Sequence, residues 1–166
     1  MKMDKIYGNA EDQKIVNWEE KYATGIEPID AQHMKLFELA NHLFAACSAK
    51  DDVLQKTFKE AMHSMVDYVH FHFSAELKLL HAVDYPDYHN HKKHHDDLIK
   101  EILTAVKDYD EGKKFVPNHF VRTLRDWILS HIAVCDKAYS YYIRDLIHND
   151  TLSENKFREI LSAACS

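Results

Sequence analysis

Apolar side chains recur every three or four positions over most of this chain, which is the period of an amphipathic α-helix packed on a core. The pattern defines four long stretches, at residues 30–48, 53–83, 88–110 and 117–148. Only short connections separate them, so each helix is expected to run antiparallel to the one before it. The pattern therefore predicts an all-α protein with the architecture of an antiparallel up-down-up-down four-helix bundle.

Residues that commonly begin or end helices stand between these stretches. The segment Ser48–Asp52 offers N-cap side chains, and residues 84–87 contain a proline. Gly112 is expected just past the end of the third helix, and Pro117 is expected to open the fourth. These residues set the predicted helix boundaries.

Two shorter segments flank the bundle, which is assigned to residues 18–148. Residues 1–17 are predicted to form a polar N-terminal arm. Residues 149–166 form a C-terminal extension, in which the capping-box pattern Thr151-x-x-Glu154 predicts a short extra helix. The apolar positions of that helix are Phe157, Ile160, Leu161 and Ala164. We expect it to cover one end of the bundle or to form a dimer contact.

Composition agrees with one helical domain and narrows the partners it can have. Among the 166 residues there are three glycines and three prolines, too few for a turn-rich β architecture or a disordered chain. A formal net charge of −6 disfavours nucleic acid as a partner. No apolar run reaches membrane-spanning length, and the first residues lack the apolar core of a signal peptide. We therefore expect a cytoplasmic protein that does not associate with membranes.

Histidine is unusually abundant, with 13 in the chain. At about 100° per residue, five of them and one glutamate fall on the apolar stripe of their helix. These six are His33, His72, Glu76, His91, His95 and His131. They come from all four predicted helices and therefore converge on the bundle axis.

The remaining histidines are divided by the same test. Seven lie opposite their apolar stripe and are expected at the surface. These are His42, His63, His70, His81, His89, His119 and His148. His94 lies on the shoulder of its stripe, so the helical pattern leaves its orientation open.

Asp136 follows His131 by five residues, which places it about 140° from the stripe in a regular helix. The apolar positions after it, Tyr139, Ile143 and Leu146, are nevertheless in step with Asp136 rather than with His131. One extra residue inserted as a π-bulge would bring both side chains onto the axis, and such bulges concentrate at functional sites. We predict a π-bulge between Ser130 and Asp136.

A metal site accounts for this set of buried polar groups. A single histidine on an apolar face is most often a hydrogen-bonded core residue, but so many uncompensated polar groups in one core would cost several kcal/mol each. Imidazole with carboxylate suits iron, and less well manganese or zinc, whereas no thiolate ligand for a softer metal is indicated. Seven ligands exceed the needs of one ion. Two ions that share both carboxylates, with three histidines on one and two on the other, leave one coordination position open.

Four motifs extend this pattern along residues 18 to about 145. They are Trp18-x3-Tyr22-x-Thr24-Gly25-Ile26-x2-Ile29-Asp30-x-Gln32-His33, His72-Phe-x2-Glu76, Tyr85-Pro86 followed by His91-x3-His95, and Trp127-x3-His131-x4-Asp136-Lys137. In order and spacing they resemble the hemerythrin family, specifically its single-domain bacterial members. The resemblance implies a non-haem di-iron centre with an oxo or hydroxo bridge that reversibly binds dioxygen.

The resemblance also implies a role for each residue. One iron ion would be held by His91, His95 and His131, and the ion with the open position by His33 and His72. The bridging carboxylates would be Glu76 and Asp136. The positions that match the oxygen pocket of the family are Leu36, Trp127 and Ile128, for which ordinary core packing is the alternative.

These expectations favour a binding protein for oxygen carriage, storage or sensing over an enzyme. The alternative is a di-iron enzyme that reduces or detoxifies oxygen, peroxide or nitric oxide at the same open position. Iron storage in a ferritin-like bundle needs paired Glu-x-x-His motifs, and the chain has only Glu60-x-x-His63, with His63 facing outward. A separate redox partner and a homo-oligomer are the further partners considered.

Overall fold

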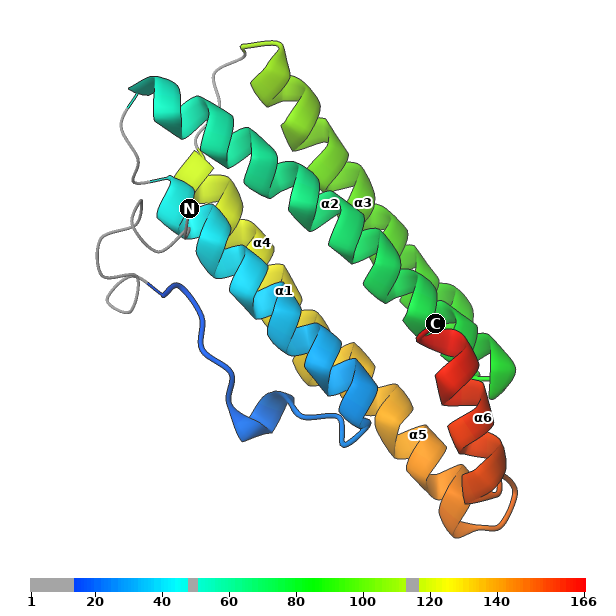
Figure 1. The fold of residues 1–166 in the computed structure, drawn as a ribbon. Coiled ribbons are helices and arrows are strands. Elements are labelled where there is room, and N and C mark those ends of the chain that lie inside the picture. Colours follow the sequence, from blue (N-terminus) through cyan, green and yellow to red (C-terminus); the bar gives the residue numbers. More distant parts are fainter. Residues whose placement is uncertain (1–13, 48–50, 113–116) are drawn as a thin grey trace.

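The computed structural model of the protein describes residues 14–47, 51–112 and 117–166, and of residues 51–55 the backbone only. Within these residues every regular element is a helix, and four long rods run antiparallel in the order up, down, up, down (Figure 1). The first three rods are α1 (Glu27–Ala46), α2 (Asp51–Ala82) and α3 (Tyr88–Asp110). The fourth consists of α4 (Pro117–His131), a π-helical turn η4 (Ile132–Asp136) and α5 (Lys137–His148). The predicted all-α four-helix bundle is confirmed.

The first helix begins three residues earlier than residue 30, where the apolar pattern placed its start. Pro28 occupies the first turn of α1, where its missing N–H leaves no hydrogen bond unmade. The Asp30 carboxylate accepts hydrogen bonds from the backbone N–H and hydroxyl of Thr24, each at 2.7 Å, and from the N–H of Gly25 at 3.0 Å. These bonds fold the preceding loop back onto the start of the helix.

The other boundaries follow their predicted residues closely. Gly112 has φ +65° just past the end of α3, a conformation that glycine adopts without strain. Pro117 opens α4 as predicted. Of the predicted N-cap segment Ser48–Asp52, residues 48–50 lie outside the described residues.

The predicted C-terminal helix is present as α6 (Glu154–Ala164), but Thr151 does not cap it. The hydroxyl of Ser153 accepts the N–H of Lys156 instead. Thr151 belongs to the turn that closes α5, because its N–H donates to the carbonyl of Leu146 at 2.9 Å. Ser153, the first residue after that turn whose side chain can serve as a cap, is therefore the N-cap, and the helix begins at Glu154.

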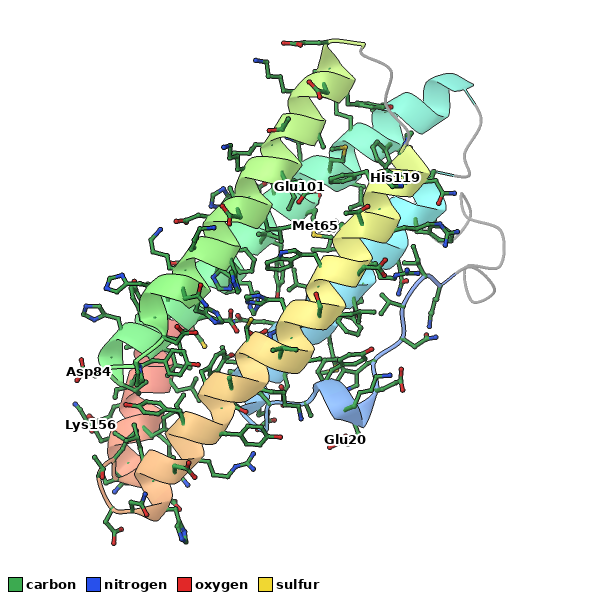
Figure 2. All side chains as sticks on the ribbon, turned by 180° about the vertical axis from the view of Figure 1, so that it is seen from behind. Glu20, Met65, Asp84, Glu101, His119 and Lys156 are labelled. Atoms are coloured by element: carbon green, nitrogen blue, oxygen red, sulfur yellow. The ribbon has the colours of Figure 1, made fainter. Side chains whose placement is uncertain are left out.

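Two apolar clusters fill the bundle. The larger contains Leu36, Phe37, Leu43, Phe58, Met65, Val69, Leu98, Ile102, Leu124 and Ile128, among others. The smaller contains Ile26, Ile29, Leu79, Leu80, Val83, Tyr139, Ile143 and Ala164. In Figure 2 the side chain of Met65 lies between the helices, whereas Glu101 and His119 lie on the outside. Along α1, α2 and the fourth rod, buried polar residues separate the members of one cluster from those of the other.

The segment before the short 3-10 helix η3 (Glu20–Tyr22) is held against the bundle. Asn41 on α1 accepts hydrogen bonds from the N–H groups of Ile15 (2.9 Å) and Val16 (3.1 Å), and its amide donates to the Val16 carbonyl (2.9 Å). Val16 is buried in the larger cluster. Residues 1–13 of the predicted arm lie outside the described residues.

No helix within residues 14–47, 51–112 and 117–166 combines the length and the apolar character that crossing a bilayer requires.

The contacts of Asn41 generate a prediction about stability. Asn41→Ala should lower the free energy of unfolding by about 2 kcal/mol, because three backbone groups lose their partners. Urea denaturation followed by circular dichroism measures this change. His42→Ala, at the exposed neighbouring position, is the matched control and should be neutral. Equal stability of the two variants would show that the segment is not held by Asn41.

Candidate metal centre

Seven buried polar side chains meet between the two apolar clusters, and they are the seven ligands predicted from the sequence. Their exposed fractions are 0% for His33, 1% for His72, 0% for Glu76, 2% for His91, 0% for His95, 5% for His131 and 0% for Asp136. All seven histidines predicted to face outward are exposed, and His94 is half-buried. The division of the histidines into inward and outward sets is therefore confirmed.

Helices α2 and α3 each contribute residues four positions apart, which places both side chains on one helix face. His72 and Glu76 come from α2, and His91 and His95 come from α3. The Glu76 carboxylate lies at the centre of this group. Its Oε2 is 3.7 Å from His72 Nε2, 3.6 Å from His91 Nε2 and 3.3 Å from His95 Nε2.

The other two rods complete the cluster around the second carboxylate. His33 Nε2, from α1, is 3.3 Å from Asp136 Oδ2 and 3.6 Å from Glu76 Oε1. His131 Nε2 is 3.2 Å from Asp136 Oδ1. The carboxylates thus lie inside a ring of imidazole nitrogens that comes from all four rods.

The π-helical turn explains how His131 and Asp136 reach the same point. Residues Ile132–Asp136 adopt the wider π-helical winding, in which each backbone hydrogen bond spans one more residue than in an α-helix. Asp136 consequently points inward, and Val134 within the turn is 66% exposed. The π-bulge predicted between Ser130 and Asp136 is confirmed.

The donor atoms of these seven side chains form two groups that share one residue. Within each group the ligand atoms lie within 4.8 Å of one another, and Glu76 belongs to both. The first group is Glu76, His91, His95, His131 and Asp136, and the second is His33, His72 and Glu76. Three histidines therefore surround one point and two surround the other.

Several of these atoms lack any hydrogen-bond partner within the described residues. They are both ring nitrogens of His33, Glu76 Oε2, His91 Nε2, His95 Nδ1 and both carboxylate oxygens of Asp136. Buried polar atoms are normally satisfied, so an unpartnered set this concentrated needs another explanation. Bound cations would satisfy the lone pairs, and the residues present therefore fit a metal centre.

Two further side chains orient the ligands from outside. Gln32 Oε1 lies 2.9 Å from His72 Nδ1, and both groups are buried. Because an amide oxygen can only accept, Nδ1 carries the proton and the lone pair of Nε2 faces Glu76. The Tyr139 hydroxyl donates to Glu76 Oε1 at 2.6 Å. Sequence reasoning missed both contacts, since it treated Gln32 only as part of a motif and Tyr139 only as a core position.

Aromatic rings cover two of the histidines. Phe73 stacks on His95 with ring centroids 3.5 Å apart, and Trp127 stacks on His131 at 4.4 Å. The contact of Phe73 was not anticipated, although its position directly after His72 could have suggested it. Trp127 thus lies against the group with three histidines.

The other two predicted pocket residues are buried and apolar. Leu36 and Ile128 are each 3% exposed and belong to the larger apolar cluster. Leu36 follows His33 by about one helical turn, and Ile128 precedes His131 by about one turn. Their role in an oxygen pocket stays a prediction.

Burial and the neighbouring charged groups shift the pKa values of the ligands in opposite directions. Burial lowers the pKa of His33, but Asp136 and Glu76 raise it to about 9. Burial also lowers the pKa of His131, yet Asp136 raises it to about 10. Burial raises the pKa of both carboxyl groups, but the imidazoles hold that of Glu76 well below its usual value and bring that of Asp136 to about 2. Burial lowers the pKa of His72 to about 4, which keeps its ring neutral.

Comparison with known proteins places this site in a family. Residues 24–141 match the family model described as the hemerythrin HHE cation binding domain. A bacteriohemerythrin of Clostridium acetobutylicum is 31% identical over 132 residues, which are 74% of this chain and 96% of that protein. A bacteriohemerythrin of Stenotrophomonas maltophilia is 28% identical over 130 residues, 78% of this chain and 82% of that protein.

A solved structure agrees with the sequence relatives. The crystal structure of a wild-type hemerythrin is similar to this fold with a TM-score of 0.71 and 26% identity, covering 76% of this chain and 95% of that one. The stretch matched by the family model begins before His33 and ends after Asp136, so it contains all seven buried polar side chains. The chain belongs to the hemerythrin family.

Proposed function

We propose that the protein holds two iron ions and reversibly binds dioxygen, for oxygen carriage, storage or sensing. The observation that carries the proposal is the pair of donor groups that share Glu76 and differ by one histidine. Unequal ligand numbers leave a coordination position open on one ion, and an open position is what a small ligand requires. Membership of the hemerythrin family supports the same function.

The donor set suits iron. His91, His95 and His131 would hold one ion, and His33 and His72 would hold the other. Imidazole and carboxylate are ligands that iron shares with manganese and zinc, and the family supports iron among them. Glu76 and Asp136 would bridge the two ions, together with an oxo or hydroxo group. Such a centre, when bound, supplies the two electrons that reversible oxygen binding requires.

Hydrogen bonds within the protein orient two of the ligands even when no metal is bound. Gln32 holds the proton of His72 on Nδ1, so Nε2 is the nitrogen available for coordination. The Tyr139 hydroxyl donates a hydrogen bond to Glu76 Oε1. The other carboxylate oxygen, Oε2, has no hydrogen-bond partner within the described residues and is therefore available for coordination. Both contacts reduce the freedom of side chains that would otherwise rotate in the absence of a metal.

The surroundings of the open side favour binding over further chemistry. We propose that Leu36, Trp127 and Ile128 line the oxygen pocket and exclude water from it, with Trp127 on the side of the three-histidine group, where it stacks on His131. The hydroxyl of Tyr139 already donates to Glu76 and is not free to protonate a bound ligand. General acid catalysis needs a positioned proton donor, so we propose a binding protein rather than an enzyme.

Four further properties remain expectations of the proposal. We expect the protein to act in the cytoplasm, and the net charge of −6 gives no reason to expect nucleic acid as a partner. A separate redox partner would return oxidised iron to the ferrous state. Self-association stays a prediction.

Reversibility is the direct test of the proposed function. Diferrous protein mixed with oxygen should develop a visible charge-transfer band that disappears under vacuum and returns over several cycles. Absorption spectroscopy with oxygen titration measures it. Rapid, irreversible oxidation accompanied by turnover of peroxide or nitric oxide would instead support a di-iron enzyme.

Removal of single histidines tests the ligand assignment. His72→Ala and His131→Ala should each lower bound iron, from about two ions per chain towards one or none. His63→Ala should leave it unchanged, because His63 is exposed. Iron analysis of reconstituted protein measures the ratio, and circular dichroism checks that the variants fold. Equal loss from all three variants would refute the assignment.

The pKa values of His33 and His131 generate a prediction about pH. With their pKa raised to about 9 and about 10, both rings are protonated at neutral pH and must lose their protons to bind a metal. Ferrous binding near pH 7 should therefore release about two protons per chain and weaken as the pH falls. Anaerobic calorimetry in buffers of different ionisation enthalpy counts the protons. Binding without proton release would contradict the raised pKa values.

A further inference from the structure

Helix α6 lies outside the stretch that matches the family model, which ends at residue 141. In Figure 1 it turns back from the end of α5 and runs along the end of α2. Ala164 is 4% exposed and belongs to the smaller apolar cluster with Leu79, Leu80 and Tyr139. Phe157, Ile160, Leu161 and Cys165 are half-buried and pack against the same cluster. The extension is therefore part of the core at this end of the bundle.

The connection to α6 is closely fixed. The N–H groups of Thr151 and Leu152 both donate to the carbonyl of Leu146, at 2.9 and 3.0 Å. Asp150 adopts φ +55° in this turn, and Ser153 caps the helix that follows. The helix is thus held at its start by hydrogen bonds and along its length by apolar contacts.

Two residues near α6 form hydrogen bonds with metal ligands from outside. Tyr139 packs in the cluster that α6 covers and donates to Glu76. Gln32 is 7% exposed, contacts His72 Nδ1, and lies beside Cys165 just past the end of α6. Burial raises the pKa of the Cys165 thiol, and the neighbouring Gln32 side chain opposes that rise. The end of α6 is therefore linked to Glu76 through the apolar cluster that contains Tyr139, and to His72 through the neighbouring Gln32.

We infer that α6 is a positioning element of the metal centre, which holds Gln32 against His72 and Tyr139 against Glu76. The consequence for bound iron rests on the proposed function, whereas the effect on His72 itself does not. Ala164 and Cys165 are the residues through which α6 acts. They are positioning residues, since they lie beside Tyr139 and Gln32 and would act on the ligands only through them.

The physical reason is competition with water. If α6 leaves its place, the Gln32 amide becomes solvated and can rotate, and water can accept the proton of His72 Nδ1 in its stead. The imidazole then loses its single orientation and its preference for one tautomer. His72 is the ligand on the side with two histidines, so the disturbance falls on the ion proposed to bind oxygen.

A matched pair of substitutions on the full chain tests this role. Ala164→Glu places a carboxylate in the buried contact, which should displace the end of α6 because an unpaired buried charge is strongly unfavourable. Ala163→Glu introduces the same residue at the exposed neighbouring position and serves as the control. Hydrogen exchange of the α6 amides confirms displacement in the first variant and its absence in the second.

The first measurement uses protein without metal. In ¹⁵N-histidine-labelled protein, the ring signals of His72, assigned with His72→Ala, should show a single tautomer protonated at Nδ1. Ala164→Glu should shift these signals towards the average of both tautomers, and Ala163→Glu should leave them unchanged. A displaced α6 with unchanged His72 signals would overturn the inference. This measurement decides the role of α6 even if the protein were to bind no iron, a result that would refute only the proposed function.

The second measurement uses iron-loaded protein. Ala164→Glu should lower the affinity for the more weakly held iron ion by about tenfold, the usual effect of losing an outer contact of a ligand. Cys165→Ala should have a smaller effect in the same direction, and Cys165→Ser, which keeps a hydrogen-bonding group, should restore most of it. Equal iron affinity in wild type, Ala164→Glu and Ala163→Glu would count against the inference.

Discussion

The burial of two carboxylates among five imidazoles is the constraint on which the rest of this structure depends. Glu76 and Asp136 are fully buried, and each can remain charged there only because histidine nitrogens surround it. Removing one partner would leave an uncompensated charge in an apolar core, which is far more costly than losing an exposed ion pair. The four rods must therefore pack so that their buried polar residues lie at the same height along the bundle. The two apolar clusters fill the bundle on either side of that height.

Much of this arrangement could be predicted from the sequence, because it follows from helical phase. Residues four apart share a face, so His72 with Glu76 and His91 with His95 could be placed without knowing any contact. The change of phase between His131 and Tyr139 revealed the π-helical turn in the same way. Phase specifies which side chains point inward, and an inward histidine on every rod is enough to locate the centre.

Phase does not specify how side chains orient one another. The bond from His72 to Gln32 depends on an amide whose rotation no periodic pattern records, and the stacking of Phe73 on His95 depends on rotamers chosen by packing between two helices. The N-cap residue of α6 was predicted wrongly for a related reason. Thr151 has the right type of side chain, but its backbone is engaged by the turn after α5. Such details arise from tertiary contacts, which lie beyond local sequence.

The π-helical turn also fixes how the fourth rod lies along the bundle. One surplus residue rotates everything after it by about 100°, so α4 and α5 present different faces of one continuous rod to the two apolar clusters. Leu124 and Ile128 belong to the larger cluster, and Tyr139 and Ile143 belong to the smaller. A uniform helix could slide by one turn against its neighbours and still bury an apolar face. This rod cannot slide in that way, because a shift by one turn would move the junction between its two faces away from the ligands. The π-helical turn therefore fixes the register of the rod against its neighbours.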